Sequence, residues 1–127
     1  MSKTINKEIW INAPVEEVFR RFTVAEAMLE WHGKEVETNP VPGGIYKVVF
    51  EDGTTILGEF KEVELNKRLC YSAAYGTVET LIEVQFIPEK GGTLLKLRQD
   101  FLGDDDVSPF SAGWDYFLGI LVDFLKG

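Results

Sequence analysis

The sequence predicts an α+β domain in which an antiparallel sheet is covered by a long C-terminal helix. Three observations support this prediction. A strand pattern and two short helical patterns open the chain, alternating segments with short turns fill its middle, and an apolar stripe with helical spacing closes it. A length of 127 residues fits one domain with its own hydrophobic core.

The opening of the chain is predicted to form a strand and two short helices. Apolar residues within 5–11 favour a strand, which Asn12-Ala13-Pro14 ends, and Pro14 suits the first position of a helix. A second helix is predicted to begin at Thr23, whose hydroxyl would form a capping box with Glu26. Gly33 is predicted to end that helix.

The middle of the chain is predicted to be β throughout. Asp52-Gly53 is a hairpin signal, and short clusters of turn residues separate the other segments. Together with the first strand, these segments predict an antiparallel sheet of six or seven strands. The five predicted strands of this region are 45–50, 55–64, 68–75, 78–87 and 93–101.

Alternation indicates that one face of this sheet is buried. Every second residue from Ile82 to Phe86 is apolar, with charged or polar residues between, so another element must cover this face. The C-terminal segment is predicted to do so as one helix over 107–126, with Ser108 as its cap and Pro109 at its start. The apolar stripe of that helix consists of Phe110, Trp114, Phe117, Leu118, Leu121, Phe124 and Leu125.

Composition excludes several classes of function. A net charge of −8 argues against binding to nucleic acid or to an anionic membrane surface. The single cysteine, Cys70, excludes an internal disulfide and a cysteine metal cluster. Neither a signal peptide nor a membrane-spanning segment is recognisable, so we expect a soluble, cytoplasmic protein.

No catalytic residue, metal site or cofactor is predicted. The single histidine, His32, is interpreted either as a polar group at a pocket mouth or, preferentially, as a helix-end residue contacting the last carbonyls. Asp104-Asp105-Asp106 lacks the spacing of a calcium loop, and Glu79 and Glu83 are expected to be solvated.

The order of elements resembles the helix-grip fold, and a series of short motifs along the chain resembles one family. The motifs are Ile11-Asn12-Ala13-Pro14, Val18-Phe19, Ala27-Met28-Leu29-Glu30-Trp31, Gly43-Gly44-Ile45-Tyr46, Asp52-Gly53, Gly58-Glu59-Phe60, Asn66-Lys67-Arg68-Leu69, Gly92-Thr93-Leu94-Leu95 and Gly113-Trp114. In this order they are similar to the activator of heat-shock-protein-90 ATPase homologue family. That family belongs to the START-like, polyketide-cyclase and pollen-allergen-related superfamily. The resemblance implies one START-like domain over residues 1–127. The chain departs from the family at His32, where members often carry another aromatic or a polar residue, and at Gln99, where many members carry a histidine.

The inward face of the predicted sheet and helix supplies the candidate ligand-binding residues. Bulky aromatic side chains with a few polar ends suit a pocket for a small molecule, although the same side chains could simply fill a core. The resemblance favours a real cavity. The candidate residues are Tyr46, Phe50, Phe60, Tyr71, Tyr75, Ile82, Gln99, Phe101, Trp114 and Phe117.

Three functions follow from these expectations. The first is non-enzymatic binding of a small hydrophobic or amphipathic ligand between sheet and helix. The second, implied by the resemblance, is a co-chaperone-like domain with a chaperone partner and a part in the stress response. The resemblance also implies that full activators carry a further N-terminal domain, so this chain alone is not expected to stimulate the ATPase. The third is a cyclase or hydratase, which the sequence favours least because only Tyr and Gln are predicted inside the cavity.

Overall fold

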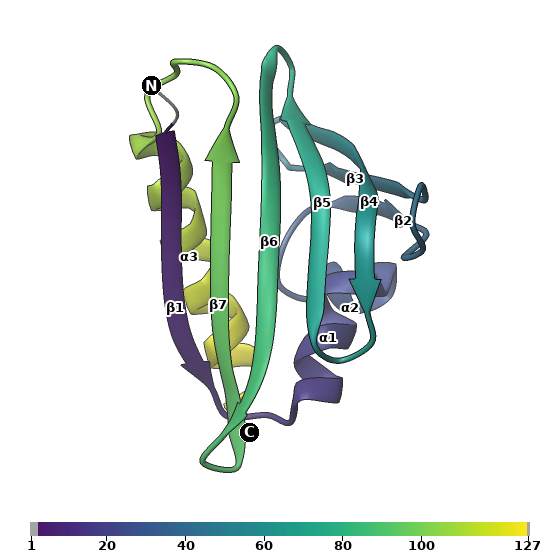
Figure 1. The fold of residues 1–127 in the computed structure, drawn as a ribbon, viewed down its shortest axis with the longest axis vertical. Coiled ribbons are helices and arrows are strands. Elements are labelled where there is room, and N and C mark those ends of the chain that lie inside the picture. Colours follow the sequence, from purple (N-terminus) through teal and green to yellow (C-terminus); the bar gives the residue numbers. More distant parts are fainter. Residues whose placement is uncertain (1–2, 127) are drawn as a thin grey trace.

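The computed structural model describes residues 3–126, which form a curved seven-stranded antiparallel sheet with helices on its concave side (Figure 1). The strand order is β1-β7-β6-β5-β4-β3-β2, so the first strand pairs with the last. This is the predicted helix-grip arrangement. In chain order, the elements are β1 (Lys3–Ile11), α1 (Val15–Thr23), α2 (Ala25–Met28), β2 (Glu35–Thr38), β3 (Ile45–Val49), β4 (Thr55–Glu64), β5 (Arg68–Tyr75), β6 (Val78–Glu89), β7 (Gly92–Phe101) and α3 (Ser108–Phe124).

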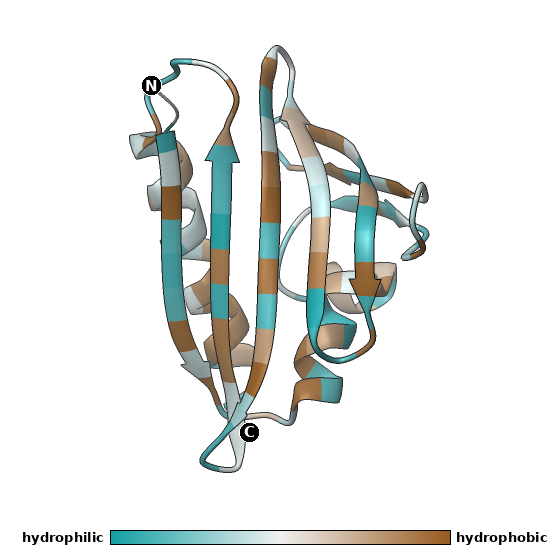
Figure 2. Cartoon of the chain, viewed as in Figure 1, coloured by the Kyte–Doolittle hydropathy of each residue, from teal (hydrophilic) through white to brown (hydrophobic). Residues whose placement is uncertain are grey.

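The predicted burial pattern of the central strands is confirmed. Apolar and polar bands alternate along β6 and β7 (Figure 2), and Ile82, Val84 and Phe86 are buried. On α3, Trp114 and two leucines are buried against the sheet. Burying a leucine or phenylalanine side chain contributes about 1.5–3 kcal/mol, so these two layers supply much of the folding free energy.

One end of the predicted α3 stripe faces solvent instead. Phe124 is 47% exposed, and the Arg21 guanidinium lies 4.7 Å from its ring centroid. The predicted stripe therefore holds for the buried residues of α3 but not for Phe124, whose ring contacts Arg21 of α1. Within residues 3–126, no helix combines the length and the apolar character needed to cross a membrane.

The strand β2 was not predicted, because two of its four residues are glutamates. It lies at the edge of the sheet and pairs only with β3. An edge strand tolerates charged side chains because one of its sides faces water. The Thr38 hydroxyl also donates to the Thr23 carbonyl at 2.7 Å, which ties this edge to the end of α1.

Three predicted helix boundaries were wrong: α2 ends at Met28 and not at Gly33, and neither predicted N-terminal cap forms. Thr23 ends α1 instead of starting α2, and its hydroxyl donates to the Phe19 carbonyl at 2.9 Å. A buried threonine at the end of a helix satisfies its hydroxyl by bonding back one turn, so it forms no capping box. At α3, Ser108 follows the N-cap residue Val107, and its amide donates to the Asp106 carboxylate at 3.0 Å. That bond lowers the pKa of Asp106.

Candidate functional site

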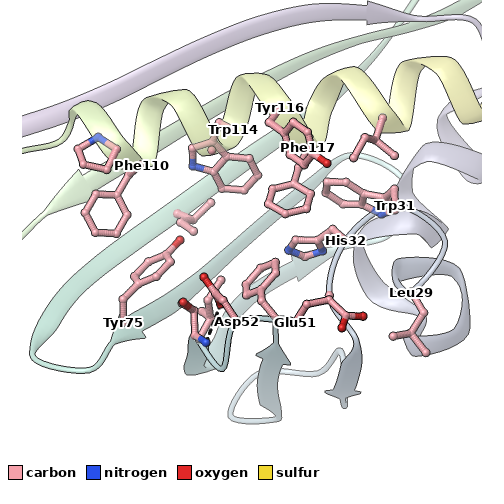
Figure 3. Close-up of a pocket in the computed structure, with 18 of the residues that line it drawn as sticks. Leu29, Trp31, His32, Glu51, Asp52, Tyr75, Phe110, Trp114, Tyr116 and Phe117 are labelled. Carbon is pink, nitrogen blue, oxygen red and sulfur yellow. Dashed lines mark hydrogen bonds between the residues drawn. The ribbon is translucent and has the colours of Figure 1, made fainter.

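A cavity of about 830 Å³ separates α3 from the sheet. Its walls come from α3, from the inner face of β3 to β6, from the turn that follows α2, and from the β3–β4 hairpin. Figure 3 shows the aromatic side chains of α3 facing Tyr75 and the hairpin across the cavity. The lining residues are Leu29, Glu30, Trp31, His32, Gly33, Tyr46, Phe50, Glu51, Asp52, Thr54, Ile56, Tyr75, Ile82, Pro109, Phe110, Gly113, Trp114, Tyr116, Phe117 and Ile120.

Six of the ten candidate residues lie in this lining, and four lie behind it. The six are Tyr46, Phe50, Tyr75, Ile82, Trp114 and Phe117. The four behind the lining are Phe60, Tyr71, Gln99 and Phe101, all fully buried.

Aromatic side chains of the lining pack against three of these four. The Tyr46 ring lies over Tyr71 and Phe60, with centroid distances of 4.3 Å and 5.7 Å. Phe110 packs against Phe101 at 5.0 Å. Alternation correctly assigned the face of the sheet, but it carries no information about which side chain lies in front of another.

Gln99 is the centre of a buried polar network behind the cavity. Its Oε1 accepts a 2.8 Å hydrogen bond from the indole Nε1 of Trp114, and its Nε2 donates to the Thr80 hydroxyl at 3.0 Å. The same Nε2 donates to the Tyr75 hydroxyl oxygen at 3.3 Å. Because Tyr75 accepts this bond, and no hydrogen bond donated by its hydroxyl is seen among the described residues, its proton is available to a ligand.

The buried tyrosines are uncharged at neutral pH. Burial raises the pKa of Tyr46, and a hydrogen bond with Tyr71 partly offsets this effect. Burial likewise raises the pKa of Tyr75, against the opposing effect of its hydrogen bond with Gln99. Tyr46 and Tyr75 therefore offer uncharged hydroxyl groups to the cavity.

His32 lies in the cavity wall, not against helix-end carbonyls, so the preferred interpretation of this residue was wrong. The imidazole is 6% exposed and stacks on Trp31 at 4.4 Å between ring centroids. Phe50 and Phe117 contact it edge-on at 5.3 Å and 5.6 Å. Burial lowers the pKa of His32 to about 4, so the ring is neutral at pH 7. Among the described residues, its Nδ1 has no hydrogen-bond partner.

The turn after α2 contributes residues to the cavity that were not predicted from the sequence. Leu29 and Trp31 were predicted only as helix residues, and Phe110 only as part of the α3 stripe. The sequence feature that could have indicated this contribution is the pair Trp31-His32 immediately before Gly33. The positive φ of Gly33 and the 2.7 Å separation between an added Cβ and Val48 Cγ1 require glycine here. This turn consequently holds the aromatic pair against the sheet.

The rim of the cavity is acidic. Glu30, Glu51 and Asp52 are exposed and lie in the lining, and in the described part of the chain no lysine or arginine does. Glu30 pairs with Arg21, which also binds Glu17 at 2.6 Å. No ion pair among residues 3–126 involves Glu51 or Asp52. The Asp52 carboxylate accepts a 2.9 Å bond from the Thr54 amide, which lowers its pKa.

The other candidate groups for chemistry lie outside the cavity. Cys70 is a half-buried strand residue, and burial raises the pKa of its thiol. Glu83 pairs with Arg68 at 2.5 Å, and Glu79 is exposed. Within the described residues, no group of three or more His, Cys, Asp or Glu side chains is placed to hold a metal ion.

Comparison with solved structures places this fold among known relatives. An AHSA1-like protein of Rhizobium etli is 33% identical, with a TM-score of 0.79 over 100% of this chain and 84% of that one. The Aha1 dimer of Colwellia psychrerythraea is 22% identical, with a TM-score of 0.86 over 97% of this chain and 96% of that one. DynU16, a protein of the dynemicin biosynthetic locus, is 24% identical, with a TM-score of 0.88 over 97% of this chain but 47% of that one.

Comparison of sequences gives the family. No curated protein matches the chain. The family model described as "Activator of Hsp90 ATPase homolog 1-like protein" matches residues 12–126, which is nearly the whole chain. The chain therefore belongs to the Activator of Hsp90 ATPase homolog 1-like protein family.

Proposed function

We propose that this protein binds a small hydrophobic or amphipathic molecule in the cavity between the sheet and α3. The observation that carries the proposal is the cavity itself, about 830 Å³ in volume and lined mainly by aromatic and aliphatic side chains. Pockets for small ligands typically have volumes of about 300–1,000 Å³ and apolar walls with few polar groups. The candidate contact residues are the six that line the cavity, joined by His32, Trp31 and Phe110.

A glycine within α3 supports the interpretation of this cavity as a ligand-binding site. Gly113 lies in the cavity wall, and a Cβ built there meets nothing within 4 Å. Glycine inside a helix is about 1 kcal/mol less favourable than alanine. Since no neighbouring atom requires glycine here, we infer that its role is to keep this wall open.

The polar network behind the cavity supports orientation of the ligand. Gln99 fixes both Trp114 and Tyr75, so the indole face and the free Tyr75 proton hold one arrangement. A ligand with a hydrogen-bond acceptor would meet a donor already in position, which reduces the entropy lost on binding.

The test is titration with Nile red, an uncharged dye that fluoresces in apolar surroundings. We expect saturable binding by the native protein and its loss in Gly113→Leu, which places a side chain inside the cavity. The matched control is Gly119→Leu on the same helix, where a Cβ also meets nothing within 4 Å and which does not line the cavity. Absence of binding by the native protein, or equal loss in both variants, would contradict the proposal.

A co-chaperone-like function is the second candidate, favoured by the family match over residues 12–126. It would act through the surface of the domain and would need no cavity. Measurement of Hsp90 ATPase activity with equimolar purified chain separates the two candidates. Stimulation that survives Gly113→Leu would favour the co-chaperone function and its link to the stress response. The cytoplasmic location stays a prediction.

An enzyme of the cyclase or hydratase kind is the third candidate. One structural neighbour comes from a biosynthetic locus, and His32 adds a neutral imidazole to the cavity wall. Any turnover should then be lost in His32→Phe, whereas binding of Nile red should remain.

A further inference from the structure

The charge around the cavity mouth has one sign. Three carboxylates, those of Glu30, Glu51 and Asp52, belong to the lining, and among residues 3–126 no basic side chain joins them. Arg21, which pairs with Glu30, lies outside the lining and also binds Glu17. The mouth therefore keeps a net negative charge, which adds to the −8 of the whole chain.

The interior behind this mouth is rich in aromatic faces. Eight of the described lining residues are Trp, Tyr or Phe, and they come from both sides of the cavity. In Figure 3, Phe117 and Trp114 on α3 lie across from Tyr75 and the β3–β4 hairpin that carries Glu51 and Asp52. Aromatic faces pack against an apolar body, and their negative charge attracts a cation and not an anion.

The buried histidine points to the same class of ligand. His32 is 6% exposed in the cavity wall, and among the described residues its Nδ1 lacks a partner. A neutral imidazole has one nitrogen with a free lone pair, which accepts hydrogen bonds from N–H donors. Burial lowers its pKa to about 4, so it adds no positive charge that would attract a carboxylate.

We propose that the ligand is a cationic amphiphile, with an amine or ammonium group on an apolar body. Its positive group would lie at the mouth, where the carboxylates of Glu51 and Asp52 attract it and the unpartnered Nδ1 of His32 can accept one of its N–H groups. Its apolar body would lie among the aromatic rings. This inference rests on the proposed function, since it names the class of molecule that the same cavity takes. An anionic amphiphile such as a fatty acid would meet three carboxylates and no basic partner.

The experiment compares three probes that share one apolar chain and differ in charge. Decylamine, decanol and decanoate are titrated against the protein carrying Nile red, at concentrations where each probe is monomeric. We expect decylamine to displace the dye at about tenfold lower concentration than decanoate, with decanol between them. Raising the salt concentration should narrow this difference, because the mouth is exposed to solvent.

A double variant locates the source of the preference. Glu51→Gln combined with Asp52→Asn removes two charges at the mouth, and we expect the ratio between decylamine and decanoate to fall several-fold. The matched control is Glu8→Gln combined with Glu79→Gln, which removes two exposed charges outside the cavity lining. This control should leave most of the preference intact.

The outcomes separate this inference from the proposed function. Dye binding with decanoate or decanol as effective as decylamine would overturn the inference and leave the proposed function standing. An equal fall in both double variants would also overturn it, because overall charge would then explain the preference. Failure of Nile red and of all three probes to bind, by fluorescence and by calorimetry, would overturn both.

Discussion

The indole Nε1 of Trp114 donates a 2.8 Å hydrogen bond to Oε1 of Gln99, and both groups are buried. This bond joins α3 to the C-terminal part of β7 at the place where the cavity separates helix from sheet. The same amide donates to Thr80 and Tyr75, so one side chain fixes the position of the helix and of a polar group in the cavity wall.

Gln99→Leu should destabilise the fold, because it leaves the Trp114 Nε1–H buried without an acceptor. We expect a loss of about 1–3 kcal/mol in the free energy of unfolding, measured by urea denaturation. Trp114→Phe in the Gln99→Leu background should recover part of that loss. Additive effects of the two substitutions would contradict a direct coupling.

Substitutions on α3 should separate its buried face from its exposed face. Leu118→Ala and Leu121→Ala remove buried side chains and should each cost about 2–5 kcal/mol. Asp123→Ala, at an exposed position, should change stability by no more than about 0.5 kcal/mol. Thermal denaturation of the three variants checks this, and similar small effects at all three positions would contradict the packing of α3.

Stability should fall as the pH drops from 6.5 toward 4 because of His32. The unfolded chain takes up a proton near pH 6.5, whereas burial lowers the pKa in the folded state to about 4. Protonation therefore favours unfolding below pH 6.5, and the total effect is about 3 kcal/mol. Urea denaturation across this pH range measures it.

The control for this pH dependence is His32→Phe, which retains an aromatic ring and removes the chain's single histidine. The carboxylates are common to both proteins, so the difference between their pH profiles isolates His32. Parallel profiles between pH 6.5 and 5 would show that the imidazole is not buried in solution.

A bound ligand should raise the stability of the native protein but not that of Gly113→Leu. Binding only to the folded state contributes about 2.7 kcal/mol at a ligand concentration about 100 times the dissociation constant. Differential scanning fluorimetry with Nile red or decylamine tests this. An equal thermal shift in Gly113→Leu would place the ligand outside the cavity.

The sequence determined the architecture. Alternation in β6 and β7, the turn residues between strands and the helical spacing of α3 each depend on local periodicity, so a single chain reveals them. The predictions that failed concerned helix caps. Thr23 and Ser108 carry typical cap side chains, but the Thr23 hydroxyl bonds back to the Phe19 carbonyl and the Ser108 amide bonds to Asp106, so neither side chain caps a helix.

For the candidate site, too, periodicity predicted one part and tertiary packing decided the other. Periodicity determined that Tyr46, Tyr75 and Trp114 face inward, and these residues do line the cavity. Only the tertiary structure decided which inward side chains form the surface of the cavity and which lie behind it. It also brought His32 from the α2 turn and the acidic β3–β4 hairpin to the same opening. Depth and mouth charge depend on how distant segments pack together, and neither leaves a periodic signal in the sequence.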